Sequence, residues 1–240
     1  VLCRRYKVYE SMRKQTTFEE YINNVGLEKF ADEYNRVVEI LYAKGISELA
    51  EEGWIIPSFV NWFQIKTLEP LNSNRDKLIK GWIHQYTENG IEILNDIVKD
   101  CPEKWKTVLN ECVECYLNGR YQICIPALVT IYEGMLSHKV YGLEPKQIHY
   151  VGALETNLQQ NNYVGVDFIL ALSVKEFTKR FFMKRDFTLD EPIEINRHWV
   201  AHGRSNLSAD NLTVMKLFNA VSTVMYLNNK WAEIYSEKTL

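Results

Sequence analysis

The sequence predicts an all-α protein, and three observations lead to this fold class. Apolar residues recur at helical spacing along most of the chain, as at Val37, Val38, Leu41 and Tyr42. Glycine (11) and proline (6) are scarce among the 240 residues, which argues against a turn-rich all-β fold. Apolar residues make up 46% of the chain and charged residues 25%, an ordinary globular composition with ample material for a core.

Residues 1–74 are predicted to form an N-terminal helical region. Residues 1–17 are basic and polar, and a helix is expected within 18–50. The chain then breaks at 53–58, where Pro57 favours an extended conformation at Ile56, and Ser58 can start a short helix that carries Phe59, Trp62 and Phe63. The stretch 68–74 (LEPLNSN) is the best linker candidate, so we place a soft domain boundary there.

Residues 75–240 are predicted to form a helical bundle. One-sided apolar stripes indicate successive helices over 75–99, 102–118, 120–139, 145–161 and 166–183. Asn118-Gly119 ends the second of these helices, and Gly134 in the third would let another helix approach closely. Ser208 or Asp210 is expected to cap a long final helix.

The most distinctive stretch is 190–204, DEPIEINRHWVAHGR. We predict a helix over 191–202, with Asp190 as its N-cap, Pro192 in its first turn and Gly203 just after its end. Ile195 and Trp199 can then face the core, and His198 and His202 share another face. Arg197 lies about 140° around such a helix from His202, so the two side chains would flank a phosphate from different sides.

This stretch resembles the signature of a known superfamily. Arg197-His198-Trp199-Val200-Ala201-His202 resembles the Rx4–6H motif of the HEPN superfamily, and the wider pattern NRHxxxHG, with Asn196 and Gly203, resembles HEPN-like proteins of bacteria and their phages. The resemblance implies an all-α bundle, commonly a homodimer, with many members acting as metal-independent RNases in toxin, abortive-infection or other phage-defence roles. It implies one composite site built by Arg197 and His202 of two protomers.

The residue types suit that chemistry. Histidine titrates near neutral pH, so His202 can act as an acid or base toward the 2′-hydroxyl or the leaving oxygen. Arg197 is always protonated and can stabilise the crowded phosphate of the transition state. His198 is the expected positioning group or second proton carrier. The alternative is structural: Arg197 bridges a nearby acid, and the histidines are satisfied polar groups favoured by the helix dipole.

Further residues are candidates around this motif. Lys179 and Arg180 belong to a basic cluster (Lys175, Lys179, Arg180, Lys184 and Arg185) that can bind phosphates or simply be solvated, while the interleaved phenylalanines are expected in the core. Asn196 and Arg204 flank the motif and are further substrate-binding candidates. Glu133 is a candidate partner for Arg197 or a histidine, although a solvent-facing position is the simpler interpretation, and neighbouring Tyr132 can also reach the site.

The charge and the cysteine content limit which binding partners and which cellular compartment we expect. The formal charge of −3 shows that the chain has no overall excess of positive charge for binding nucleic acid, so any RNA contact must come from a local basic patch. Cys112 and Cys115 form a CxxC without a second metal-ligand pair, so we expect no metal or cofactor and interpret the five cysteines as reduced thiols. Val1-Leu2-Cys3 runs directly into a basic segment and no apolar run is long enough for a membrane span, so a cytoplasmic protein with no membrane partner is expected. The sequence begins with Val1 and not with Met, which suggests a fragment of a longer chain.

The resulting functional expectation is a metal-independent endoribonuclease of HEPN type that acts on RNA as a homodimer, controlled by an antitoxin or a phage-derived regulator. The main alternative is a non-catalytic HEPN-like module that binds RNA, nucleotide or protein. A third possibility is a structural protein in which Arg197 is held in a buried salt bridge.

Overall fold

A computed structural model describes residues 26–65, 75–137, 150–160, 163, 165–206 and 210–237. Within these residues all regular structure is helical, with nine helices and no strand, which confirms the predicted all-α class. The helices are α3 (Leu27–Glu51), α4 (Trp62–Ile65), α5 (Arg75–Asp100), α6 (Glu103–Leu117), α7 (Tyr121–Ser137), α8 (Tyr150–Gln160), α9 (Val166–Phe181), α10 (Arg197–Ala201) and α11 (Asn211–Glu237).

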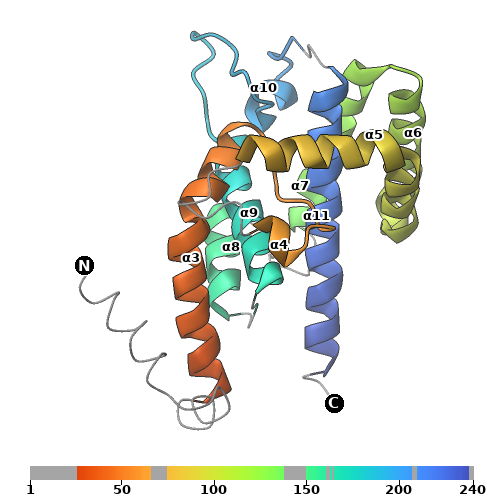
Figure 1. Cartoon of the computed structure of the whole chain (residues 1–240). Coiled ribbons are helices and arrows are strands. Elements are labelled where there is room, and N and C mark those ends of the chain that lie inside the picture. Colours follow the sequence, from red (N-terminus) through yellow and green to blue (C-terminus); the bar gives the residue numbers. More distant parts are fainter. Residues whose placement is uncertain are drawn as a thin grey trace.

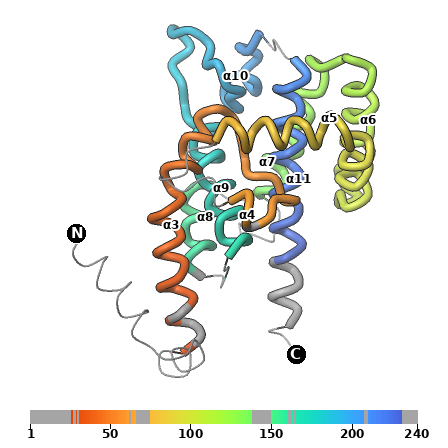
Figure 2. The backbone as a smooth tube through the Cα atoms, viewed as in Figure 1, coloured from red at the N-terminus to blue at the C-terminus, as the bar shows by residue number. Residues whose placement is uncertain are grey.

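The helices form a bundle with α10 at one end. α9 packs against α3 and α8, and α11 packs against α7, α9 and α5. Figure 1 shows the long helices α3 and α11 running lengthwise, with α5 crossing over the bundle near the end that carries α10. The tube in Figure 2 shows how the loop between α9 and α10 extends beyond the bundle at that same end. The short helix α10 is held there by its contacts with α7.

One hydrophobic core joins residues from both sides of the predicted linker. Tyr42 and Ile46 of α3 and the loop residue Trp54 belong to the same buried cluster as residues of α5, α7, α9 and α11. The predicted linker 68–74 and the basic segment 1–17 lie outside the described residues. The described residues before the linker therefore pack into the bundle that follows it.

The buried loop after α3 is held by side chains of α9 and α11. The amide of Ile56 donates to the hydroxyl of Ser173 (2.9 Å), and the carbonyl of Ile56 accepts from the hydroxyl of Thr223 (3.1 Å). Asn219 Nδ2 donates to the carbonyl of Ile55 (2.6 Å). These bonds satisfy backbone groups that neither helix nor sheet can pair, so the loop can be buried at low cost.

Several helix ends follow the sequence rules. A glycine with positive φ lies two residues after the end of each of α3, α6 and α10: Gly53 (77°), Gly119 (71°) and Gly203 (62°). After each helix, the amides of this glycine and of the next residue donate to carbonyls of the last turn. Gly203 N, for example, donates to Val200 O, and Arg204 N donates to Trp199 O. Asp210 caps α11 by accepting from the amide and hydroxyl of Thr213, which confirms one of the two predicted caps.

Two predicted helix starts are wrong. The motif helix was expected over 191–202 with Asp190 as N-cap, but residues 191–196 are not helical and α10 begins at Arg197, capped by Asn196. The short helix expected from Ser58 begins instead at Trp62, where Asn61 and Gln64 cap each other through reciprocal side chain to amide bonds of 3.1 Å. In both cases a later side chain satisfies the free amides better.

Candidate active site

Asn196 sets the start and the position of α10. Its Oδ1 accepts from the amides of His198 (3.0 Å) and Trp199 (3.3 Å), and its own backbone is extended (φ −116°, ψ 124°). Its Nδ2 donates to the carbonyl of Met183 (3.0 Å), just after α9. One buried side chain therefore starts α10 and ties it to the end of α9, while Trp199 anchors the helix in protein interior.

The two motif histidines lie in contact. The ring centroids of His198 and His202 are 4.6 Å apart in an edge-to-face arrangement, which confirms that they share one face. Phe187, from the loop before α10, stacks on His198 at 4.7 Å with the rings almost parallel (6°) and also meets His202 edge-on at 5.6 Å. Phe187 thus orients the pair and is not the core residue that the sequence indicated; His202 itself is exposed.

Arg197 points to α7. Its Nε and Nη2 donate to the two carboxylate oxygens of Glu133, both at 2.9 Å, in a bidentate ion pair. The Tyr150 hydroxyl donates to the same carboxylate at 3.2 Å, and the guanidinium lies over Phe182 at 5.9 Å. Glu133 is therefore the partner of Arg197 and is not the solvent-facing residue of the simpler interpretation. The side chains remain partly exposed, at 32% for Arg197 and 25% for Glu133.

The surroundings change the protonation of two groups. Partial removal from water, followed by the positive charges of His202, Lys184 and Arg197, lowers the pKa of His198 below its ordinary value. Burial, followed by the charge of Glu133 and the hydrogen bond to it, raises the pKa of Tyr150 to about 12. At neutral pH the neutral form of His198 is thus favoured and Tyr150 keeps its proton.

A cavity of about 450 Å³ opens between α7, α8 and α10. Arg197 and His198 line it together with two aromatic residues, a lysine and an acid, and the full lining is Glu133, Tyr150, Val151, Gly152, Phe182, Lys184, Arg197 and His198. The volume lies within the range of small-molecule sites, roughly 300–1,000 Å³. The site residues are therefore open to a ligand and are not packed away from solvent.

Other predicted site residues lie in different surroundings. Arg204 is exposed, with its guanidinium 5.4 Å from the Phe187 ring, on the histidine side of α10. Lys179 is exposed at the end of α9, whereas Arg180 pairs with Glu51 and Ser47 of α3 at a second cavity. The expectation that Tyr132 reaches the site is wrong, because its ring is buried against Phe177 and Phe181 and its hydroxyl pairs with Thr178.

Two residues of the site had no sequence signal. Tyr150 falls within the predicted helix 145–161, where the sequence indicates no role for it, and Phe182 is one of the phenylalanines expected in the core. Their positions depend on the contact of α8 with α9, where the two rings meet at 4.5 Å. The alternation of phenylalanines and cations around 177–187 was the only indication that aromatic groups could reach the motif.

Comparisons with known proteins assign no family to the chain. No family model, curated protein or solved structure matches the chain. Over the described residues, no group of three or more His, Cys, Asp or Glu side chains has a metal-binding arrangement, and no helix is long and apolar enough to cross a membrane.

Proposed function

We propose that the chain is a metal-independent endoribonuclease of HEPN type. One observation carries this proposal: two imidazoles in contact at 4.6 Å, one of them exposed, next in sequence to a guanidinium that lines an open cavity. Two histidines and a fixed positive charge are the groups that cleavage of a ribose-phosphate linkage needs when no metal takes part.

The two imidazoles divide the proton transfers. A neutral imidazole accepts the proton of the 2′-hydroxyl as the 2′-oxygen attacks phosphorus, and a protonated imidazole donates a proton to the 5′-oxygen as the P–O5′ bond breaks. The lowered pKa of His198 suits the accepting role. His202 is then the donor, which fits the acid/base role expected for it.

Arg197 has capacity left for a phosphate. The pair with Glu133 uses two of the five N–H donors that a guanidinium carries, which leaves three. Glu133 and Tyr150 fix the plane of the guanidinium, and Phe182 supports it from one side. A fixed cation costs little reorganisation when negative charge develops on the phosphate.

The proposed active form is a homodimer. Within one protomer Arg197 turns to α7 while His202 turns to Phe187, so the two groups lie on different sides of α10. A second protomer that brings its His198–His202 pair to Arg197 would complete the composite site, with the guanidinium and both imidazoles around one phosphate. The same proposal includes RNA as substrate, a cytoplasmic location, and a toxin or phage-defence role with an antitoxin or phage-derived regulator. These parts of the proposal rest on the motif resemblance.

One observation favours a second candidate, a non-catalytic HEPN-like module that binds RNA, nucleotide or protein. Arg197 is engaged by a carboxylate within its own protomer, as a structural arginine would be. In that case the cavity beside Arg197 would bind a ligand without cleaving it.

RNA cleavage in EDTA separates the two candidates. We expect the chain to cut RNA without added metal, and His202→Ala to abolish cleavage without loss of stability, because His202 is exposed. His84→Ala, at an exposed histidine of α5, is the matched control and should cut normally. Binding of RNA without cleavage would support the module instead, and full cleavage by His202→Ala would refute the assigned site.

A further inference from the structure

A second cavity borders the segment that leads into α10. It has a volume of about 300 Å³ and lies between the ends of α3 and α9 and the loop 192–196. Its lining includes Glu51, Phe177, Arg180, Arg185, Glu194 and Asn196. The proposed cleavage chemistry uses none of these residues except the capping residue Asn196, so this cavity needs an explanation of its own.

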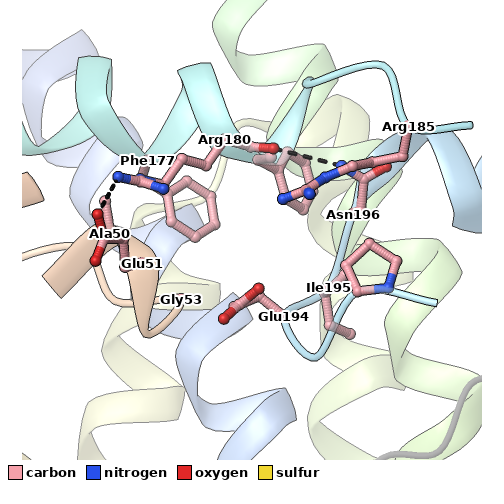
Figure 3. Close-up of a pocket in the computed structure, with 11 residues that line it drawn as sticks. Ala50, Glu51, Gly53, Phe177, Arg180, Arg185, Glu194, Ile195 and Asn196 are labelled. Atoms are coloured by element: carbon pink, nitrogen blue, oxygen red, sulfur yellow. Dashed lines mark hydrogen bonds and ion pairs between the residues drawn. The ribbon is translucent and has the colours of Figure 1, made fainter. Parts of the chain in front are cut away.

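Two guanidinium groups face this cavity. Figure 3 shows Arg180 and Arg185 along one side and the carboxylate of Glu194 on the opposite side, with open space between them. Within the described part of the chain Arg185 makes no ion pair or hydrogen bond and is exposed, so all of its donors are available. Arg180 pairs with Glu51 at 2.5 Å, but both side chains are solvent-accessible (33% and 56%), and such pairs are weak in water.

The remaining walls of the cavity are apolar or carry hydrogen-bond acceptors. Phe177 is mostly buried (5% exposed), and its ring borders the cavity from α9, while Ile195 borders it from the loop. Glu194 makes no hydrogen bond or close ion pair with any described residue, although its charge helps to hold the proton of nearby Lys216. Free carboxylate oxygens next to an aromatic wall can accept hydrogen bonds from an amino group on a flat ring.

We propose that this cavity binds a nucleoside monophosphate unit, with the phosphate on Arg185 and Arg180 and the base against Phe177 and Glu194. Guanidinium groups recognise phosphate through paired N–H donors. The volume is at the lower end for ligand sites, roughly 300 Å³, which suits one nucleotide and not a larger cofactor. The proposal does not rest on RNA cleavage, and the unit can be a free nucleotide or one nucleotide of an RNA strand.

Binding of adenosine monophosphate to the full chain, measured by calorimetry, tests the assignment. We expect saturable binding that Arg185→Gln weakens about tenfold or more, since charge-assisted hydrogen bonds to the phosphate are lost. Glu194→Gln should weaken adenosine monophosphate but not inorganic phosphate, because the carboxylate meets only the base. Lys80→Gln, at an exposed cation of α5 that does not line the cavity, is the control and should bind normally.

The two sources of the nucleotide give different results. A single-stranded oligoadenylate that binds more tightly than the monophosphate, competes with it and is weakened by Arg185→Gln would identify a nucleotide of a strand. Failure of the oligonucleotide to compete would identify a free nucleotide. The proposal would be overturned if the monophosphate showed no saturable binding at millimolar concentration. Equal affinity in Arg185→Gln would also overturn it. Tighter binding in Arg185→Gln would overturn it as well, because that result would indicate a cationic ligand.

Discussion

Partial removal from water and three positively charged or ionisable neighbours lower the pKa of His198. Partial burial and the charges of His202, Lys184 and Arg197 all lower its pKa, so the imidazole stays neutral to lower pH than a free histidine does. A base with a lowered pKa keeps activity further into the acidic range. The acidic limb of the pH profile should therefore lie below the ordinary histidine value of about 6.5.

Lys184→Gln tests this environment. Removing one positive charge should raise the pKa of His198 and move the acidic limb of RNA cleavage to higher pH. Titration of the His198 ring by NMR measures the first effect directly. Lys179→Gln removes an equal charge from a residue that does not contribute to the shift and should leave the titration unchanged. Identical His198 titrations in the wild-type chain and Lys184→Gln would contradict the electrostatic account.

At the scale of single elements, α10 depends on its first cap. Asn196 caps two amides of α10 and bonds to two carbonyls near the end of α9, so Asn196→Ala should lower the free energy of unfolding by about 1–3 kcal/mol. Asn196→Asp keeps the cap acceptor but turns a carboxylate oxygen toward the two carbonyls in a buried position, so it should destabilise the fold as well. Urea denaturation measures both variants, and an Asn196→Ala variant as stable as wild type would refute this role.

The packing of α6 against α7 depends on Gly134. A Cβ at this position would lie 2.9 Å from Cζ2 of the Trp105 ring, and Trp105 is buried. Gly134→Ala should therefore destabilise the fold by roughly 1–3 kcal/mol despite the better helix propensity of alanine. Gly152→Ala, in α8 with open space around it, is the matched control and should stabilise by about 0.5–1 kcal/mol. Thermal or urea unfolding of the pair decides between the two signs.

Local patterns predicted the elements better than their starts. The stops at Gly119 and Gly203 and the cap at Asp210 follow from local backbone chemistry, and the sequence contains that chemistry in full. Asp190 and Asn196 both satisfy the local rule for an N-cap of the motif helix. Asn196 is the cap in the structure, where carbonyls near the end of α9 also hold it, and such a long-range contact has no local signal.

At the scale of the whole molecule, the site is assembled by contacts that sequence spacing does not show. Glu133 lies 64 residues before Arg197, and the two meet only because α7 packs beside α10. The motif itself could be identified from the order of Arg197, His198 and His202. The partners Glu133, Tyr150 and Phe187, and the second cavity around Arg185, depend on how the helices pack.

A double-mutant cycle measures what the Arg197–Glu133 pair contributes to this assembly. Each of Arg197→Ala and Glu133→Ala should destabilise the fold, and the coupling between them should be on the order of 1–2 kcal/mol, because the bidentate geometry is good but both side chains are partly exposed to screening water. Urea denaturation of the four proteins gives the value. Strictly additive effects would mean that the pair does not hold α10 to α7.

The chemical ends of the cleavage products test the central claim most directly. Attack by the 2′-oxygen, with proton transfer by His198 and His202, leaves a 2′,3′-cyclic phosphate and a 5′-hydroxyl. The wild-type chain in EDTA should produce these ends from RNA and leave the same strand intact when the ribose at the cleaved position lacks its 2′-hydroxyl. Products with 5′-phosphate ends, or cleavage of the 2′-deoxy strand, would contradict the account.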